Sequence, residues 1–191
     1  EGFMPIEVFG AHNLNNLAGA KWVCQNMGVD EADFFEAIAS FKGASKRLEK
    51  IAESSTKVAY KDFAHSPSKV LATTGAVKNQ YPDRKLVACL ELHTYSSLNP
   101  DFLNEYEGAL NAADVAVVFY SPDAVKIKQL NEVSYEQISK AFNRNDLIIY
   151  TSPAAFKDFL FAQNFDNSAL LLMSSGNYGG LNFDDVKALI I

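Results

Sequence analysis

Three short polar stretches carry most of the side chains in this sequence that could do chemistry. They read KDFAHSPSK at 61–69, ELHTYSSLN at 91–99 and SSGNYGGLN at 174–182, and each one follows an apolar run. Histidine, carboxylate, hydroxyl and amide groups of this kind bind hydroxylated or anionic ligands, and histidine also moves protons. The candidate site residues are Asp62, His65, His93, Thr94, Ser96, Ser174 and Asn177.

Each candidate also has a purely structural explanation. Asp62 can accept hydrogen bonds from a ribose diol or cap the turn that follows it. His65 precedes Ser66 and Pro67 at an expected helix start, where it can donate to a phosphate or carboxylate or belong to the capping region. Serine, asparagine and glycine also supply turns. The glycine-rich stretch 174–180 has neither the GxGxxG nor the GxxxxGK[ST] spacing, so the main cradle for a nucleoside triphosphate would lie elsewhere.

Alternating strands and helices must position these stretches. Strands are expected near 46–53, 57–61, 85–92, 114–120, 147–150 and 169–174. Helices are expected after Ser66, over 100–111 and 133–142, after Ser152, and from Asn182. The later strands are continuous apolar runs, which is typical of a parallel sheet covered on both faces. We therefore expect a Rossmann-like α/β domain whose ligands lie beyond the carboxyl ends of the strands, where the three polar stretches would meet.

A helical segment precedes this domain. Apolar residues at helical spacing predict a helix over 14–27 followed by Gly28, and Asp30 can cap a second helix that ends at Gly43. Two such helices cannot close a core alone. We expect them to pack against the rest of the chain, a missing part of it or a second copy.

The composition narrows the classes of partner. The chain has 191 residues, of which 48% are hydrophobic, and a formal charge of −6 without a basic patch, which argues against nucleic acid as a partner. No apolar stretch approaches the roughly 20 residues that cross a bilayer, so no membrane association is expected and the protein is read as cytoplasmic. Cys24 and Cys89 stand in apolar segments and are expected to be buried thiols.

Three motifs in order resemble the carboxyl-terminal part of the Mur ligases, the ATP-dependent enzymes of peptidoglycan synthesis. GAHNLNN at 10–16 is similar to the family's GxHNxxN, and FKGASKRLE at 41–49 to F-x-G-x-x-x-R-x-E. KDFAHSPSK is similar to D-[DN]-[FY]-[AG]-H-x-P. Lys61 and Ser66 depart from the pattern, the latter replacing the second histidine of the frequent H-H-P, so the role of that histidine does not carry over.

The resemblance implies an activity and roles for individual residues. ATP with Mg²⁺ phosphorylates a carboxylate of a UDP-muramoyl substrate, and the amine of an amino acid or peptide then displaces phosphate to form an amide. By similarity Asn16 contacts adenine, Arg47 reaches the nucleotide phosphates and Asp62 holds the ribose, with His65 nearby. Residues 1–44 would be the tail of the central ATP-binding domain and 45–191 the third domain. The UDP-binding domain and most of the ATP and Mg²⁺ ligands would precede Glu1, so this chain alone is expected to be inactive.

Two branches of the family are the closest in sequence pattern. One adds L-alanine to UDP-N-acetylmuramate, and its H-R-Y-[TS]-R loop places two arginines where this sequence has Thr94 and Ser97. The other recycles the tripeptide L-alanyl-γ-D-glutamyl-meso-diaminopimelate, and its M-S-N-G-G-F-G-G loop resembles MSSGNYGG at 173–180. The tripeptide branch is favoured. His93, Thr94, Ser96, Ser174 and Asn177 are then expected to bind substrate, with Ser175 and Tyr178 in the same peptide-binding loop.

Two alternatives remain open. The chain could be a freestanding nucleotide- or peptide-binding module of Rossmann-like fold without catalytic activity. It could also belong with the related folylpolyglutamate synthases, although the H-x-P segment and the loop at 174–180 fit that group less well.

Overall fold

A six-stranded sheet with the order β1-β2-β6-β3-β4-β5 forms the centre of the computed structural model, which describes residues 4–131 and 133–191. All neighbouring strands are parallel except β1 and β2. The expected Rossmann-like, mostly parallel sheet is confirmed, and each of the six expected strands is present with slightly different ends. The strands are β1 (Glu49–Glu53), β2 (Lys57–Asp62), β3 (Lys85–Glu91), β4 (Val115–Phe119), β5 (Ile148–Tyr150) and β6 (Ser168–Met173).

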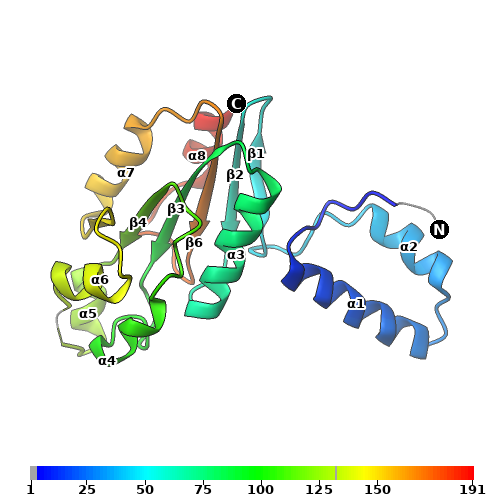
Figure 1. The fold of residues 1–191 in the computed structure, drawn as a ribbon, viewed down its shortest axis with the longest axis horizontal. Coiled ribbons are helices and arrows are strands. Elements are labelled where there is room, and N and C mark those ends of the chain that lie inside the picture. The colour runs from blue at the N-terminus through cyan, green and yellow to red at the C-terminus, as the bar shows by residue number, and fades with distance from the viewer. Residues whose placement is uncertain (1–3, 132) are drawn as a thin grey trace.

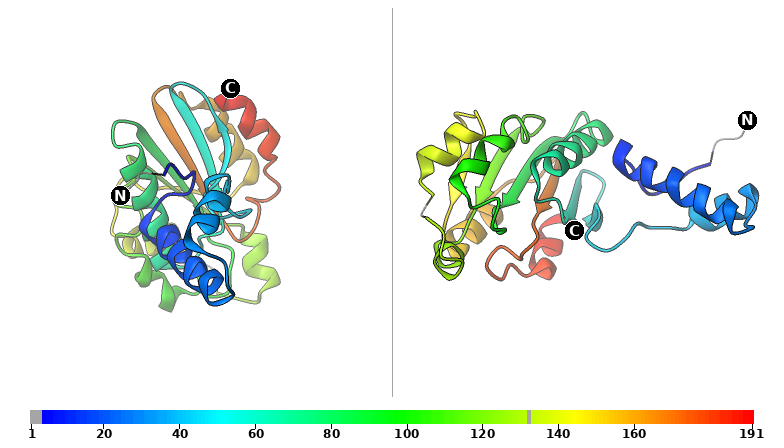
Figure 2. Two further views of the ribbon diagram at one scale, coloured as in Figure 1. Left: turned by 90° about the vertical axis from the view of Figure 1, so that its right-hand side faces the viewer. Right: turned by 90° about the horizontal axis from the view of Figure 1, so that it is seen from below.

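Helices cover both faces of this sheet (Figures 1 and 2). One face packs against α3 (Pro67–Gln80), α4 (Pro100–Leu103), the 3-10 helix η1 (Asn104–Tyr106), α5 (Pro122–Ile127) and α6 (Tyr135–Ala141). The other face packs against α7 (Pro153–Ala162) and α8 (Phe183–Ile190). The result is a three-layer domain in which the strands are buried between helices.

The central strand β3 shows how the apolar runs serve both layers. Leu86, Ala88 and Leu90 join the core on the α3 side. Val87 and Cys89 alternate with them and join the core on the α7 side. Cys89 is the expected buried thiol, and burial raises its pKa. Cys24 is only half-buried, and both thiols are free.

Short capping signals set the starts of most helices. The sequence reading missed one helix and expected another to be longer than it is. The side chains of Ser121 and Ser152 accept the amide hydrogens of Ala124 and Ala155 at the starts of α5 and α7. The helix α5 was not predicted, although its Ser-Pro start matches that of α7. The helix expected over 100–111 breaks after one turn into η1 and turns, and Gly108 has a φ of 72°, which a continuing helix cannot contain.

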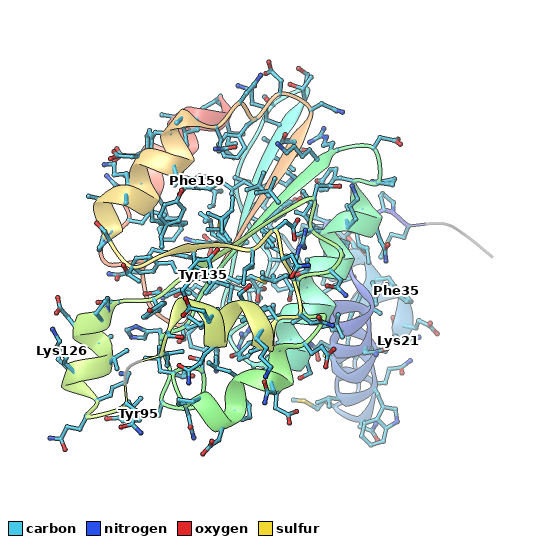
Figure 3. All side chains as sticks on the ribbon, turned by 60° about the vertical axis from the view of Figure 1, so that its left-hand side comes forward. Lys21, Phe35, Tyr95, Lys126, Tyr135 and Phe159 are labelled. Carbon is cyan, nitrogen blue, oxygen red and sulfur yellow. The ribbon has the colours of Figure 1, made fainter. Side chains whose placement is uncertain are left out.

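The helical segment at the amino-terminal end forms a hairpin that extends away from the sheet (Figures 1 and 2). It consists of α1 (Ala11–Asn26) and α2 (Glu31–Ala39), and Asp30 caps α2 as expected by accepting the amide hydrogen of Asp33. Lys21 and Phe35 face each other across the hairpin, with the ammonium nitrogen 5.1 Å from the ring centroid (Figure 3). The helix α2 ends at Ala39, before the predicted end at Gly43.

Only the start of this hairpin packs on the sheet domain. The Phe9 ring lies edge-on to Tyr60, with centroids 5.4 Å apart. Gly10, whose φ is 87°, passes so close to α3 that an added Cβ would lie 2.8 Å from the Cβ of Ala76. No residue of α1 is buried. The expectation that both helices pack against the remainder is therefore correct only for this first contact. Within the described residues, no helix is both long and apolar enough to span a bilayer.

Candidate functional site

The carboxyl ends of β2, β6 and β3 lie side by side and bring the three polar stretches to one edge of the sheet. Ser174, directly after β6, bonds to the end of β2 on one side and to the end of β3 on the other. Its main-chain amide donates to the carbonyl oxygen of Asp62 at 3.0 Å, and its hydroxyl donates to Oε2 of Glu91. The expected convergence of these stretches is confirmed. On either side of Ser174, the edge divides into two groups of side chains.

The first group surrounds a cleft of about 460 Å³, which we call the α1–α3 cleft. Asn16 comes from α1, Arg47 from the linker before β1, and Asp62 from the end of β2. Three segments that are separate in sequence thus contribute to one concave surface. The lining residues are His12, Asn13, Asn16, Arg47, Asp62, Ser68, Lys69, Ala72 and Thr73.

Asp62 is 7% exposed and already carries two structural hydrogen bonds. Its Oδ2 accepts the main-chain amide of Leu48 at 2.6 Å, and its Oδ1 accepts that of Ala64 at 2.6 Å. The turn-capping role considered for this residue is therefore present. Each carboxylate oxygen keeps a second lone pair, and Asp62 still lines the cleft.

Arg47 is exposed, and its guanidinium carbon lies 5.4 Å from the ring centroid of Phe63. Its neighbour Glu49 is engaged elsewhere, by the amide of Lys46 at 2.8 Å and by the ammonium group of Lys61 at 2.9 Å. Burial opposes ionisation of Glu49, but these hydrogen bonds outweigh it and lower the pKa of the carboxyl group. Glu49 therefore does not pair with Arg47, and the guanidinium charge is available to the cleft.

Asn16 lies in the middle of α1, so it does not cap that helix. Together with Asn13 and Arg47 it also borders an adjoining apolar pocket of about 400 Å³ between α1, α2 and the linker. The remaining lining residues of this pocket are Val8, Leu17, Ala20, Ile38, Phe41, Gly43 and Ala44. An apolar pocket thus opens beside a polar cleft, with amide side chains at the boundary.

His65 and Lys69 show two differences from the expected composition of the site. Nδ1 of His65 lies 2.8 Å from the carbonyl oxygen of Phe63, and the ring does not line the α1–α3 cleft. Its role toward a ligand stays a prediction. Lys69 does line the cleft, from the first turn of α3, but it was not singled out from the sequence. Its position two residues after Pro67 was the available signal, because the first turn of a helix attracts anions.

The second group lies beyond Ser174, at the end of β3. Here the hydroxyl groups of Thr94, Ser96 and Ser97 bond to one another. Oγ1 of Thr94 lies 3.1 Å from Oγ of Ser96 and 2.9 Å from Oγ of Ser97, whose hydroxyl oxygen also accepts the amide of Thr94. These contacts form a hydroxyl-rich turn, and Tyr95 projects from it at the edge of the domain (Figure 3).

The most deeply placed charge in this group is Glu91, which the sequence reading did not single out. It is 3% exposed, and its Oε2 accepts the hydroxyl of Ser174 and, at 2.8 Å, the amide of Tyr178. Nδ1 of His93 lies 3.6 Å from its Oε1. The available signal was a lone acidic residue closing the apolar run of β3, since carboxylates are rarely buried without partners.

The loop after β6 contains one further correction. Tyr178 was expected to contact a peptide, but its side chain is buried and its hydroxyl lies 2.7 Å from the carbonyl oxygen of Cys89 and 2.8 Å from that of Met173. Burial also raises its pKa. Asn177 is exposed, and its Oδ1 accepts the amide of Gly180 at 3.2 Å. The Ser175 hydroxyl is buried and has no hydrogen-bond partner among the described residues.

Acidic and metal-ligating side chains do not gather into a metal centre in the part of the chain that the structure describes. No group of three or more histidine, cysteine, aspartate or glutamate residues there is arranged to hold a metal ion.

No protein-family model matches the chain. The UDP-N-acetylmuramate–L-alanine ligase of Agathobacter rectalis is 34% identical over 186 residues, which cover 96% of this chain and 40% of that protein. The enzyme of the same name from Microcystis aeruginosa is 30% identical over 185 residues, or 92% of this chain and 37% of that protein. The chain therefore spans less than half the length of these relatives.

Solved structures share the fold. The UDP-N-acetylmuramate–alanine ligase of Thermotoga maritima superposes with a TM-score of 0.72 at 17% identity, covering 97% of this chain and 39% of that chain. A murein peptide ligase from Psychrobacter arcticus gives a TM-score of 0.66 at 22% identity, covering 97% and 38%. Sequence relatives over nearly the whole chain and structural neighbours thus agree, and the chain belongs to the Mur ligase family.

Proposed function

We propose that this chain is part of a longer ATP-dependent ligase that joins an amine to the carboxylate of UDP-N-acetylmuramate. The carboxylate takes the terminal phosphoryl group of ATP, the amine attacks the resulting acyl phosphate, and inorganic phosphate leaves as the amide forms. The observation that supports this proposal most directly is the α1–α3 cleft, which gathers Asn16, Arg47 and Asp62 from three separate segments.

The two adjoining cavities suit the two ends of a nucleotide. The apolar pocket between α1 and α2, with a volume of about 400 Å³, has room for a flat base, and Asn16 lines both this pocket and the cleft. Asp62 offers carboxylate lone pairs to a ribose diol. Arg47 and Lys69 bring two positive charges to the same cleft, where they can bind phosphate oxygens. ATP is therefore the proposed ligand, with Mg²⁺ bound mainly by residues outside this chain.

We assign residues 1–44 to the end of a central ATP-binding domain and residues 45–191 to the third domain. The hairpin of α1 and α2 supports this division, because Trp22 and Val23 on α1 and Met27 directly after it are exposed, as they would be on a helix that packs against another domain. The chain by itself is then expected to be inactive. UDP-N-acetylmuramate would be bound largely by the preceding domains, and the reaction is assigned to the cytoplasm.

For the amine we propose the tripeptide L-alanyl-γ-D-glutamyl-meso-diaminopimelate. The support lies in the turn at 94–97, where hydroxyl groups satisfy one another and the arginines expected of an alanine-binding loop are replaced. Without these fixed cations, capture of the small carboxylate of free alanine is harder. His93, Thr94, Ser96, Ser174 and Asn177 are assigned to the surface that faces the tripeptide.

L-Alanine is the second candidate, and one observation favours it. The relatives that cover most of the chain carry the name of the L-alanine ligase. The non-catalytic binding module receives no comparable support.

One experiment distinguishes these proposals. The longer protein is incubated with UDP-N-acetylmuramate, ATP and Mg²⁺, and L-alanine or the tripeptide is added in separate reactions while phosphate release and amide product are measured. We expect product with the tripeptide. Product with L-alanine alone would replace the tripeptide by the second candidate, and no product with either amine would refute the ligase assignment.

A further inference from the structure

The Glu91 carboxylate connects the end of β3 to the loop after β6, and its two oxygen atoms have different partners. Its Oε2 is occupied by the Ser174 hydroxyl and the Tyr178 amide. Its Oε1 points instead to the His93 imidazole, whose Nδ1 is 3.6 Å away. One oxygen therefore closes the loop, and the other faces a histidine whose side chain is 41% exposed.

Gly176 keeps this arrangement compact. A Cβ at this position would lie 2.9 Å from Oε2 of Glu91 and 3.0 Å from Cγ of His93. The loop backbone thus packs directly on both side chains and restricts where the imidazole can go. Any larger residue would displace either the carboxylate or the ring.

We propose that Glu91 is a positioning residue that keeps the Nδ1 proton of His93 directed at its own carboxylate, so that Nε2 of His93 faces outward and takes a proton from the incoming amine. This inference rests on the proposed function. The 3.6 Å separation is longer than a hydrogen bond, but the negative charge of a carboxylate attracts an N–H dipole, so a neutral imidazole beside it is expected to carry its proton on the nearer nitrogen. The farther nitrogen then keeps a free lone pair.

The proton transfer fits the amide-forming step. The amine arrives as an ammonium ion, which has no lone pair for attack. One proton passes from its nitrogen to Nε2 of His93, and the freed lone pair forms the new C–N bond at the acyl phosphate carbon. The C–O bond to phosphate breaks, and inorganic phosphate leaves with the second proton that the nitrogen must lose to become an amide. The positive charge on His93 is then next to the Glu91 carboxylate, which stabilises it until the proton passes to water.

The tautomer can be measured directly. The three histidines of the chain, His12, His65 and His93, give separate ¹⁵N signals in an imidazole NMR spectrum at about pH 8.5, where the ring is normally neutral. We expect His93 to carry its proton on Nδ1. In Glu91→Gln, the amide oxygen can replace Oε2 toward Ser174 and Tyr178 while the amide NH₂ donates to His93, so the proton should move to Nε2.

The chain supplies its own references for this experiment. Nδ1 of His65 lies 2.8 Å from a carbonyl oxygen, so this ring should show the Nδ1 proton in every variant. The matched control Glu105→Gln removes an exposed glutamate of η1 and should leave His93 unchanged. A wild-type His93 with its proton on Nε2, or a Glu91→Gln spectrum with no tautomer change at His93, would overturn the proposal.

Kinetics on the longer protein test the consequence. We expect His93→Asn to lower kcat by about 10²- to 10⁴-fold, and Glu91→Gln by about 10-fold or more, with the KM for ATP unchanged in both. Equal kcat values for Glu91→Gln and wild type would refute the positioning role. If the wild-type longer protein forms no amide at all, the ligase assignment fails, whereas the NMR result still decides whether Glu91 sets the tautomer.

Discussion

The main-chain amide of Leu48 donates to Oδ2 of Asp62 at 2.6 Å, which ties the linker before β1 to the end of β2. Leu48 follows Arg47, so this hydrogen bond holds the backbone that carries the Arg47 side chain beside the α1–α3 cleft. The same carboxylate holds the amide of Ala64 through Oδ1. Asp62 therefore builds the cleft that it lines.

We expect Asp62→Asn to destabilise the fold. One carboxylate oxygen becomes an NH₂ group that faces a main-chain N–H, either Leu48 or Ala64, and that buried donor loses its acceptor. Hydrogen bonds to charged groups contribute about 1.5 to 3 kcal/mol, and the free energy of unfolding in urea should fall by about this amount. Asp101→Asn, at the start of α4, is the control. An unchanged free energy of unfolding for Asp62→Asn would show that these two hydrogen bonds are not formed in solution.

Arg47→Ala in the longer protein is expected to weaken binding of ATP. Loss of a charged hydrogen bond of about 1.5 to 3 kcal/mol corresponds to a rise in the KM for ATP of about 10- to 100-fold. Arg84→Ala is the matched control, because Arg84 lies beside Tyr81 at the other end of α3 and donates to the carbonyl of Ser55. The role assigned to Arg47 is wrong if both variants retain the wild-type KM for ATP.

Acidification should loosen the linker through Glu49. Although burial opposes its ionisation, hydrogen bonds from Lys46 and Lys61 lower its pKa below the usual value of 4.5. A lowered pKa in the folded state contributes stability that is present above pH 4.5 and is lost as the pH falls through the folded value.

The free energy of unfolding of wild type and Glu49→Gln should therefore differ at neutral pH, and the difference should shrink between about pH 5 and pH 3. Urea unfolding at several pH values measures it. Glu36→Gln removes an exposed glutamate of α2, away from the linker, and serves as the control. A difference that stays constant over this range would contradict the assigned hydrogen bonds.

Tyr178→Phe should destabilise the loop after β6. The buried hydroxyl contacts the carbonyl oxygens of Cys89 and Met173, and its removal costs about 0.5 to 1.5 kcal/mol of net hydrogen-bond energy. Amide hydrogen exchange at residues 174–180 should accelerate more than exchange in α7. The control Tyr95→Phe removes the hydroxyl of an exposed ring. Equal exchange in wild type and Tyr178→Phe would refute the anchoring role of this hydroxyl.

Trp22 tests the assignment of residues 1–44. It is the single tryptophan of the chain and is 67% exposed on α1. We expect acrylamide to quench its fluorescence in this chain almost as strongly as that of free tryptophan. If α1 packs against a preceding domain, the longer protein should protect Trp22 once fluorescence from its other tryptophans is removed by substitution. Equal quenching in the two proteins would contradict the assignment.

Periodicity and capping residues predicted most of the fold because both are local signals. Continuous apolar runs such as 169–173 indicated buried strands, and the Ser-Pro pairs at 66 and 152 marked helix starts that the structure contains. The helix over 100–111 failed because Gly108 takes a left-handed conformation after η1. The protrusion of α1 depends on which surfaces are available to cover it, and its own residues do not encode that.

The site was predictable where motifs marked it and hidden where tertiary contacts built it. Asn16, Arg47 and Asp62 carried motif signals, and the cleft brings them together. Glu91 had no motif, and its importance depends on a loop more than 80 residues later. Tyr178 looked like a polar loop residue, but its ring stacks on Phe156 with centroids 4.9 Å apart. Such partners are distant in sequence, so spacing alone could not identify them.

The place of β6 in the sheet affects how the protein is made. This strand lies between β2 and β3, although it follows the other five strands of the sheet in sequence. Until residues 168–173 are synthesised, β2 has no neighbour on that side and the strand ends bearing Asp62 and Glu91 cannot come together. Nascent chains that stop before this segment would expose two unpaired strand edges and would be targets for chaperones or aggregation. Premature termination before β6 therefore leaves the strand ends at Asp62 and Glu91 unjoined.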